Sequence, residues 1–133
     1  MKINHRLTVL YADENEDGCL MLKTLLEFSD IELVCVDSAE AAFRAAQEKD
    51  FDLYLLDTMF SDGSGLELCG RLRNLKPRVP IVFYSADVYE SDHQKGLAAG
   101  AKAYLHKPIS SSVAPTIFTL VGTVNANSSQ HIN

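Results

Sequence analysis

The chain has 133 residues, of which 47% are hydrophobic and 23% are charged, and this composition is typical of a single compact domain rather than of a disordered protein. Its formal charge of −6, with the basic residues scattered along the chain, excludes a surface built to attract nucleic acid or an anionic membrane. Apolar runs such as residues 53–56 are far shorter than the roughly 20 residues of a membrane helix, so we expect no membrane partner and no direct nucleic-acid binding.

Short apolar runs rich in Val, Leu, Ile and Tyr alternate with helical patterns, which is typical of a parallel sheet covered by helices. Strands are predicted over residues 7–12, 33–36, 53–56, 81–85 and 103–105. The runs at 53–56 and 81–85 are continuously apolar, as in strands covered on both faces. These two strands are therefore predicted to lie in the centre of the sheet.

Helices are predicted between the strands from apolar residues at helical spacing and from capping residues. The first apolar stripe consists of Cys19, Leu22, Leu25 and Leu26. The second follows Ser38, a predicted N-cap, and consists of Ala39, Ala42, Phe43 and Ala46. Two pairs with the spacing of a capping box are predicted to begin the third and fourth helices, namely Ser64 with Glu67 and Ser91 with Gln94. Gly100 is predicted to end the fourth helix.

The last helix is predicted to follow residues 110–112. Its apolar stripe consists of Val113, Ile117, Leu120, Val121 and Val124. Pro115 is compatible with its first turn, where backbone N–H groups have no helical partner. Residues 125–133 are small and polar without periodicity, and are predicted to form a disordered C-terminal tail. One domain over residues 1–124 is therefore expected.

The three cysteines, Cys19, Cys35 and Cys69, have no C-x-x-C spacing and lie among apolar neighbours. This pattern favours reduced thiols in the core and a cytoplasmic location.

The residues that follow the predicted strands are chemically reactive. Asp13 and Glu14 follow the first strand, Asp57 the third and Lys107 the fifth, while Ser85 ends the fourth. In a doubly wound α/β sheet, ligands bind outside the carboxyl ends of the strands. Three carboxylates, a hydroxyl and an ammonium group at that edge could hold a divalent cation and a phosphoryl group.

Four segments in order carry a family resemblance: residues 7–15 (LTVLYADEN), 55–57 with 62–65 (LLD and DGSG), 80–86 (PIVFYSA) and 99–108 (AGAKAYLHKP). Through them, from Leu7 to about Val124, the chain resembles a response regulator receiver domain, the CheY-like phosphoacceptor module of two-component phosphorelay signalling. The resemblance implies a flavodoxin-like, five-stranded parallel sheet of strand order 2-1-3-4-5 with five helices.

The resemblance also assigns roles to the strand-end residues. Asp57 would be the phosphoacceptor, whose carboxylate attacks the phosphorus of a phosphohistidine or a small phosphodonor. Mg²⁺ would be bound directly by Glu14 and Asp57, through water by Asp13, and by the backbone carbonyl of Met59. Lys107 would pair with Asp57 at rest and with the phosphoryl oxygens afterwards.

Further residues take switching and tuning roles by the same resemblance. The hydroxyl of Ser85 would turn toward the phosphoryl group, and Tyr104 would move in behind it. The peptide bond before Pro108 would be cis. Met59 and Asp87 stand where the family tunes water access to the acyl phosphate, and we expect the apolar thioether of Met59 to slow self-dephosphorylation.

Two residues depart from the family pattern. Glu14 stands where Asp is usual and is one methylene longer, and Ser61 stands where Pro is common. We therefore expect weaker metal binding and a less preorganised loop after Asp57.

The resemblance implies a signalling module rather than an enzyme. A sensor histidine kinase or phosphotransfer protein would phosphorylate it, and the surface of the fourth helix, fifth strand and fifth helix would bind a downstream protein, with a homodimer as an open alternative. A receiver that works without phosphorylation is the principal alternative. An aspartyl-phosphate phosphatase would need an Asp where Met59 stands, and an FMN protein would place its phosphate against repelling carboxylates.

Overall fold

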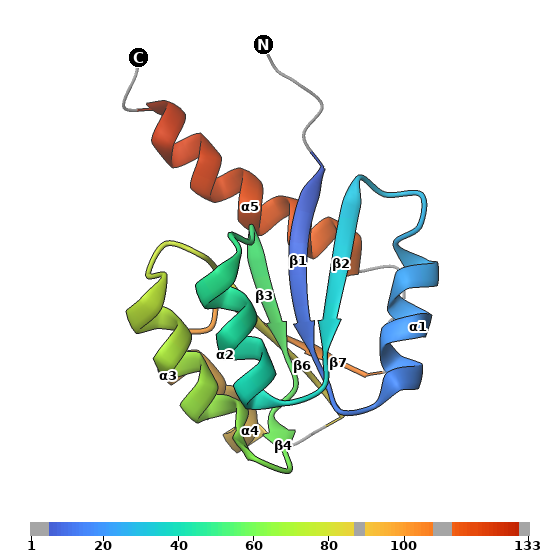
Figure 1. The fold of residues 1–133 in the computed structure, drawn as a ribbon. Helices are drawn as coiled ribbons and strands as arrows, with labels where there is room; N and C mark the ends of the chain where they lie inside the picture. The colour runs from blue at the N-terminus through green and yellow to red at the C-terminus, as the bar shows by residue number, and fades with distance from the viewer. Residues whose placement is uncertain (1–5, 87–89, 108–112, 131–133) are drawn as a thin grey trace.

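The computed structural model describes residues 6–86, 90–107 and 113–130. Its central sheet has five parallel strands (Figure 1): β1 (Leu7–Ala12), β2 (Ile31–Val36), β3 (Leu53–Leu56), β6 (Ile81–Ser85) and β7 (Ala103–His106). The helices are α1 (Glu16–Leu25), α2 (Ala39–Glu48), α3 (Gly65–Leu75), α4 (Glu90–Ala98) and α5 (Val113–Gln130). A small antiparallel pair, β4 (Met59–Phe60) and β5 (Gly63–Ser64), follows β3.

The strand order in the sheet is β2-β1-β3-β6-β7, which confirms the predicted doubly wound fold when the five strands are counted in chain order. The predicted limits of β1, β3 and β6 agree with the structure, whereas β2 begins at Ile31 and β7 extends to His106. Every residue of β3 and β6 is buried, as their apolar sequences predicted. The antiparallel pair β4–β5 was not predicted, because two-residue strands leave no periodic signal.

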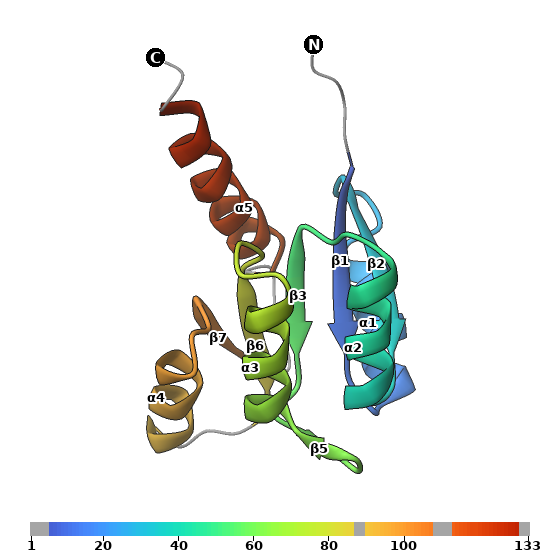
Figure 2. The same ribbon diagram turned by 60° about the vertical axis from the view of Figure 1, so that its left-hand side comes forward.

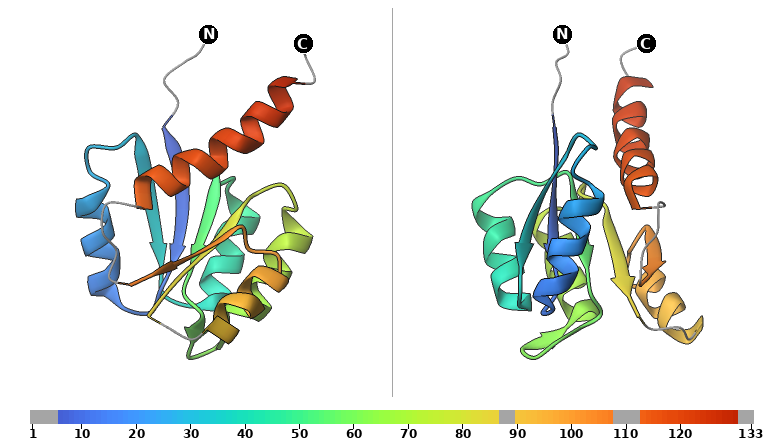
Figure 3. Two further views of the ribbon diagram at one scale, coloured as in Figure 1. Left: turned by 180° about the vertical axis from the view of Figure 1, so that it is seen from behind. Right: turned by 90° about the vertical axis from the view of Figure 1, so that its right-hand side faces the viewer.

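Two layers of helices cover the sheet. The side chains of α2 and α3 pack on one face and those of α1 and α5 on the other. Figure 1 shows α2 and α3 in front of the strands, and Figure 3 shows from behind how α5 crosses the opposite face. Helix α4 lies beside β7, at the edge far from β2 (Figure 2). All five strands are parallel, so their carboxyl ends meet at one edge of the sheet.

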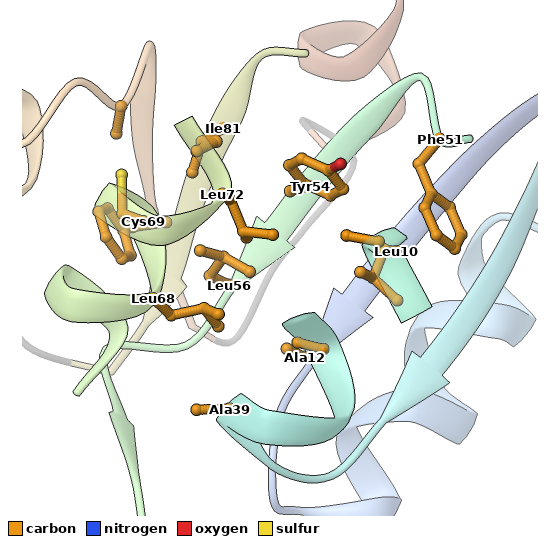
Figure 4. Close-up of a cluster of buried hydrophobic side chains, with 14 of the residues drawn as sticks. Leu10, Ala12, Ala39, Phe51, Tyr54, Leu56, Leu68, Cys69, Leu72 and Ile81 are labelled. Atoms are coloured by element: carbon orange, nitrogen blue, oxygen red, sulfur yellow. The ribbon is translucent and has the colours of Figure 1, made fainter. Parts of the chain in front are cut away.

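The core under α2 and α3 is built from alternating strand residues and from the inward faces of both helices (Figure 4). The labelled side chains in this cluster are Leu10, Ala12, Ala39, Phe51, Tyr54, Leu56, Leu68, Cys69, Leu72 and Ile81. Because each parallel strand contributes to both faces, the sheet is held rigidly between two apolar layers.

Most capping predictions are confirmed. The Ser38 hydroxyl accepts the N–H of Ala41 at 3.0 Å, and Ser64 and Glu67 form a reciprocal capping box at the start of α3. The prediction for α4 is wrong, since this helix already includes Glu90, and Ser91 therefore lies inside it rather than at an extended N-cap.

The predicted apolar stripe of α1 needs one correction. Leu22 and Leu26 are almost fully buried, but Leu25 is 45% exposed. The face toward the sheet is set by the spacing from Cys19 to Leu22 to Leu26, which places Leu25 on the flank of the helix.

The cysteine prediction is wrong for two of the three residues. Cys19 of α1 and Cys35 of β2 form a disulfide, with their Cα atoms 6.2 Å apart, whereas Cys69 is a free, buried thiol. The packing of α1 beside the edge strand β2 brings the two residues together without any C-x-x-C spacing. Sequence spacing alone could not reveal this tertiary proximity.

Helix α5 continues to Gln130, past residue 124 where it was predicted to end. Ile117 and Val121 are buried against the sheet, as predicted. Residues 125–130 contain neither Gly nor Pro, the strongest helix breakers, so small polar side chains do not stop the helix there. The domain limit at 124 stays a prediction. No helix in the described part of the chain is long and apolar enough to cross a membrane.

Candidate functional site

Backbone hydrogen bonds fix the positions of the residues at the carboxyl end of the sheet. The N–H of Asp57 donates to the carbonyl of Ala12 at 3.0 Å, and the N–H of Lys107 donates to that of Ser85 at 2.9 Å. These residues therefore continue the parallel pairing just beyond β3 and β7. As a result, side chains that are distant in sequence start from neighbouring positions at one rim.

Lys107 joins two of the three predicted carboxylates. Its Nζ donates to Asp13 Oδ2 at 2.5 Å and to Asp57 Oδ2 at 3.1 Å. The side chain of Asp13 is 3% exposed, and that of Asp57 is 19% exposed. The structure thus brings Asp13, Asp57 and Lys107 together, and leaves Asp57 the more accessible of the two acids.

The three groups have different electrostatic surroundings. Burial raises the pKa of the Asp57 carboxyl, and Lys107 only partly opposes this effect. Burial acts in the same direction on Asp13, but hydrogen bonds from Lys107, Tyr11 and the Asn15 N–H outweigh it and hold its pKa below the usual range. For Lys107, burial is outweighed by the two carboxylates, which raise its pKa. The cluster therefore favours a charged Lys107 beside a charged Asp13.

Tyr11 contacts the site, although the sequence analysis did not single it out. Tyr11 is fully buried, and its hydroxyl donates to Asp13 Oδ2. Burial and the contact with Asp13 both raise the pKa of this phenol, so it remains a donor. The missed signal is the two-residue spacing, because side chains at i and i+2 of a strand point to the same face.

Thr58 is a second residue that the sequence did not single out. Its hydroxyl lies 3.0 Å from the hydroxyl of Ser85, which is only 2% exposed, and its N–H donates to Asp57 Oδ1 at 2.7 Å. Thr58 thus contacts both the predicted acceptor and the predicted switch residue. Its position directly after Asp57 was the available signal.

Glu14 does not join the other two carboxylates. It is exposed, and its Oε2 accepts the backbone N–H of Ser61 in the loop after the acceptor. Within residues 6–86, 90–107 and 113–130, no three His, Cys, Asp or Glu side chains are placed to hold a metal ion together. Asp13 and Asp57 still offer the hard oxygen ligands that Mg²⁺ prefers, and Mg²⁺ commonly keeps several waters, so this donor set suits it.

The loop after Asp57 is held at two further points. The carboxylate of Asp62 accepts the N–H groups of Ala39 and Glu40, both at 3.0 Å, at the N-terminus of α2. These bonds hold the pKa of Asp62 below its usual range. Gly65 begins α3 so close to the loop that a Cβ there would lie 2.2 Å from the carbonyl oxygen of Asp57.

Met59 and Tyr104 flank the site on the α4 side. The side chain of Met59 is 71% exposed and lines a cavity of about 200 Å³ with residues that include Thr58 and Lys95. The Tyr104 ring lies 6.0 Å from that of Phe83 and stacks on His93 at 4.2 Å between centroids. The predicted roles of Asp87 and Pro108 lie outside the described residues.

Comparisons with known proteins place the chain in a family. The model of the response regulator receiver domain family matches residues 9–117. The chain therefore belongs to the response regulator receiver domain family, a component of two-component systems, as the motifs and the CheY-like fold predicted.

Similar proteins include two bacterial regulators and one solved structure. The chain is 33% identical over 119 residues to the nisin biosynthesis regulatory protein NisR of Lactococcus lactis, covering 90% of this chain and 49% of NisR. It is 33% identical over 102 residues to the transcriptional regulatory protein PhoP of Bacillus subtilis, covering 77% of this chain and 42% of PhoP. A two-component response regulator from Clostridium difficile superposes with a TM-score of 0.84 at 27% identity, covering 90% of this chain and 98% of that chain. The chain thus spans about half the length of these two curated relatives.

Proposed function

We propose that Asp57 accepts a phosphoryl group from a sensor histidine kinase or a phosphotransfer protein. The aspartyl phosphate then alters the surface formed by α4, β7 and α5, which binds a downstream protein. The observation that carries this proposal is the meeting of Asp57, Asp13 and Lys107 at the carboxyl end of the sheet. It supplies a nucleophile and a fixed positive charge at the same point.

The transfer needs one bond to form and one to break. A carboxylate oxygen of Asp57 attacks the phosphorus, while the phosphorus–nitrogen bond of the donor phosphohistidine breaks and its electron pair stays on that nitrogen. The Lys107 ammonium group binds the Asp57 carboxylate before the transfer, and it would bind the phosphoryl oxygens afterwards. Because the chain itself carries the product, it is a phosphoacceptor rather than a conventional enzyme.

Mg²⁺ at this rim would supply positive charge that offsets both the carboxylates and the transferred phosphoryl group. Asp57 would bind it directly, Asp13 through water, and the backbone carbonyl of Met59 would complete the protein ligands. Glu14 has to leave the Ser61 N–H to take part. We therefore expect the affinity for Mg²⁺ to be reduced.

The switch that we propose uses Ser85 and Tyr104. The Ser85 hydroxyl exchanges its contact with Thr58 for a phosphoryl oxygen, a charge-assisted acceptor. Tyr104 leaves its stack on His93 and follows Ser85 inward. This movement links the covalent change at Asp57 to the surface of α4 and β7.

The attachment of Glu14 to Ser61 favours one alternative, a receiver that binds its partner without being phosphorylated. In this alternative, the Lys107 ammonium group permanently offsets part of the negative charge of Asp13 and Asp57, and Mg²⁺ has no role.

The intact mass of the protein after incubation with a small phosphodonor separates the two functions. Wild type and Asp57→Asn are each measured with Mg²⁺ and with a chelator. One phosphoryl adduct, on wild type with Mg²⁺ only, is the expected result. If folded wild type acquires no adduct, from either the small donor or a phosphorylated kinase domain, the phosphorylation-independent function is the correct one.

A further inference from the structure

Two imidazole rings from different elements face one another at the edge formed by α4 and β7. His106 is the last residue of β7, and His93 lies in α4. Their Nε2 atoms are 2.5 Å apart, and the rings meet edge to face with centroids 4.5 Å apart. The packing of α4 beside β7 therefore directs two ring nitrogens toward one point.

Tyr104 supports both imidazole rings in this position. Its ring stacks on His93 with an interplanar angle of 21°, and its centroid lies 5.8 Å from that of His106. The backbone of α4 is also close to Tyr104, because a Cβ on Gly96 would lie 3.3 Å from the Tyr104 ring. The histidine pair is thus part of a packed three-ring cluster rather than two independent surface side chains.

The chemistry of the pair fits a metal ion that prefers nitrogen ligands. One ring with its proton on Nε2 can donate a hydrogen bond to the other, and when both neutral rings carry their proton on Nδ1, both Nε2 lone pairs are available to one cation between them. Imidazole suits Zn²⁺, Ni²⁺ and Cu²⁺, whereas Mg²⁺ prefers oxygen. A tetrahedral Zn²⁺ site places two nitrogens about 3.3 Å apart, so they would need to separate by about 0.8 Å. His106 is exposed, which leaves its side chain room for this adjustment.

We propose that His93 and His106 bind one Zn²⁺, Ni²⁺ or Cu²⁺ ion per chain and so tie α4 to β7, with water completing the coordination. A consequence rests on the proposed function: an ion at this site holds Tyr104 against His93 and opposes the movement that follows phosphorylation. This site is separate from the carboxylate rim, by which we mean Asp13, Asp57 and Lys107 at the carboxyl end of the sheet.

The binding test is a calorimetric titration of the full chain with Zn²⁺ and, separately, with Cu²⁺, in the presence of excess Mg²⁺ to fill oxygen sites. We expect one ion per chain, with Cu²⁺ bound more tightly than Zn²⁺. His93→Gln and His106→Gln should each weaken binding at least about tenfold, since even the loss of a residue that only supports a metal ligand has an effect of that size. His5→Gln and His131→Gln, which change the other two histidines of the chain, are the matched controls. Wild-type affinity in His93→Gln or His106→Gln would overturn the proposal.

Paramagnetic broadening of NMR signals locates the ion independently of the affinity. Cu²⁺ should broaden the signals of Tyr104 and α4 first, and this pattern should vanish in His106→Gln. Broadening centred on Asp13 and Asp57 would instead show that the ion binds at the carboxylate rim and would refute the histidine site.

The effect on phosphorylation is measured last, as the fraction of chain phosphorylated by a small donor with and without Zn²⁺. We expect Zn²⁺ to lower this fraction in wild type but not in His106→Gln. An unchanged fraction in Zn²⁺-loaded wild type would refute the consequence for Tyr104. A complete lack of phosphorylation without Zn²⁺ would instead refute the proposed function and leave the binding result standing.

Discussion

The hydroxyl oxygens of Thr58 and Ser85 lie 3.0 Å apart, just beyond β3 and at the end of its neighbour β6. Turning Ser85 toward a phosphoryl group has to replace this hydrogen bond. Thr58→Ala should therefore favour the phosphorylated state by about 1 kcal/mol, or roughly fivefold. The measurement is the steady-state phosphorylated fraction with a small donor. Thr58→Ser, which keeps the hydroxyl, should resemble wild type, and an equal rise in both variants would contradict this account.

Met59 should control how long the phosphoryl group remains on Asp57. Met59 lies two residues after Asp57, and its apolar side chain lines a cavity with Thr58, so we expect it to hinder a water that attacks the acyl phosphate. Asn at this position can hydrogen-bond and orient that water, so Met59→Asn should lose phosphate several-fold faster. Phosphate release from the isolated phosphorylated protein gives the rate directly. Loss no faster than in wild type would disprove the role of Met59.

Two glycines of α3 should respond oppositely to alanine. A Cβ on Gly65 would overlap the backbone at Asp57, whereas a Cβ on Gly70 would meet nothing within 4 Å. Gly65→Ala should thus lower the free energy of unfolding by about 3 kcal/mol or more, because backbone must shift. Gly70→Ala should raise it by about 0.5 to 1 kcal/mol through helix propensity. Urea denaturation of both variants tests the pair, and similar effects would argue against the close approach at Gly65.

Tyr54 should make stability fall at alkaline pH. Burial, with a smaller contribution from Asp50, raises the pKa of Tyr54 to about 12, against about 10 in the unfolded chain. Its contribution is fully present below about pH 10 and is lost as the pH rises toward 12, by about 2 kcal/mol. Tyr54→Phe should lose less stability over this range.

At neutral pH the same variant should be within about 1 kcal/mol of wild type. The Tyr54 hydroxyl is buried and has no hydrogen-bond partner among the described residues, so little is lost with it. Urea unfolding from pH 7 to 12 measures both effects, and parallel curves for the two proteins would contradict the assigned pKa.

The disulfide between Cys19 and Cys35 should stabilise the oxidised protein. It closes a loop with a sequence separation of 16, for which chain entropy predicts about 3 kcal/mol. A dithiol reductant should remove this amount from wild type and leave Cys35→Ser unaffected. Equal stability of oxidised and reduced wild type would show that the disulfide contributes nothing.

Cys69 should remain unlabelled by alkylating reagents while the protein is folded, since burial raises the pKa of its thiol.

The fold was largely predictable because its strands are short apolar runs, β3 and β6 continuously so, and its helices carry capping residues. The limits of β1, β3 and β6 and the caps at Ser38 and Ser64 follow from such local signals. The prediction that α4 begins at Ser91 was wrong because the spacing from Ser91 to Gln94 also occurs inside a helix.

The site was predictable only as a set of residues at one edge of the sheet. The convergence of Asp13, Asp57 and Lys107 follows from parallel topology. The attachment of Glu14 to Ser61 depends on side-chain rotation and loop path, which no sequence period encodes. The disulfide likewise depends on how α1 packs beside β2.

The carboxylate of Asp62 holds the loop after Asp57 on the α2 side through the first N–H groups of that helix. The loop after Asp57 is fastened to α2 by Asp62 and to α3 through Gly65, whose N–H donates to the Thr58 carbonyl at 2.7 Å. We therefore expect a displacement that begins at Asp57 to be directed away from the contacts of Asp62 and Gly65, toward β7 and α4, although neither residue takes part in the chemistry.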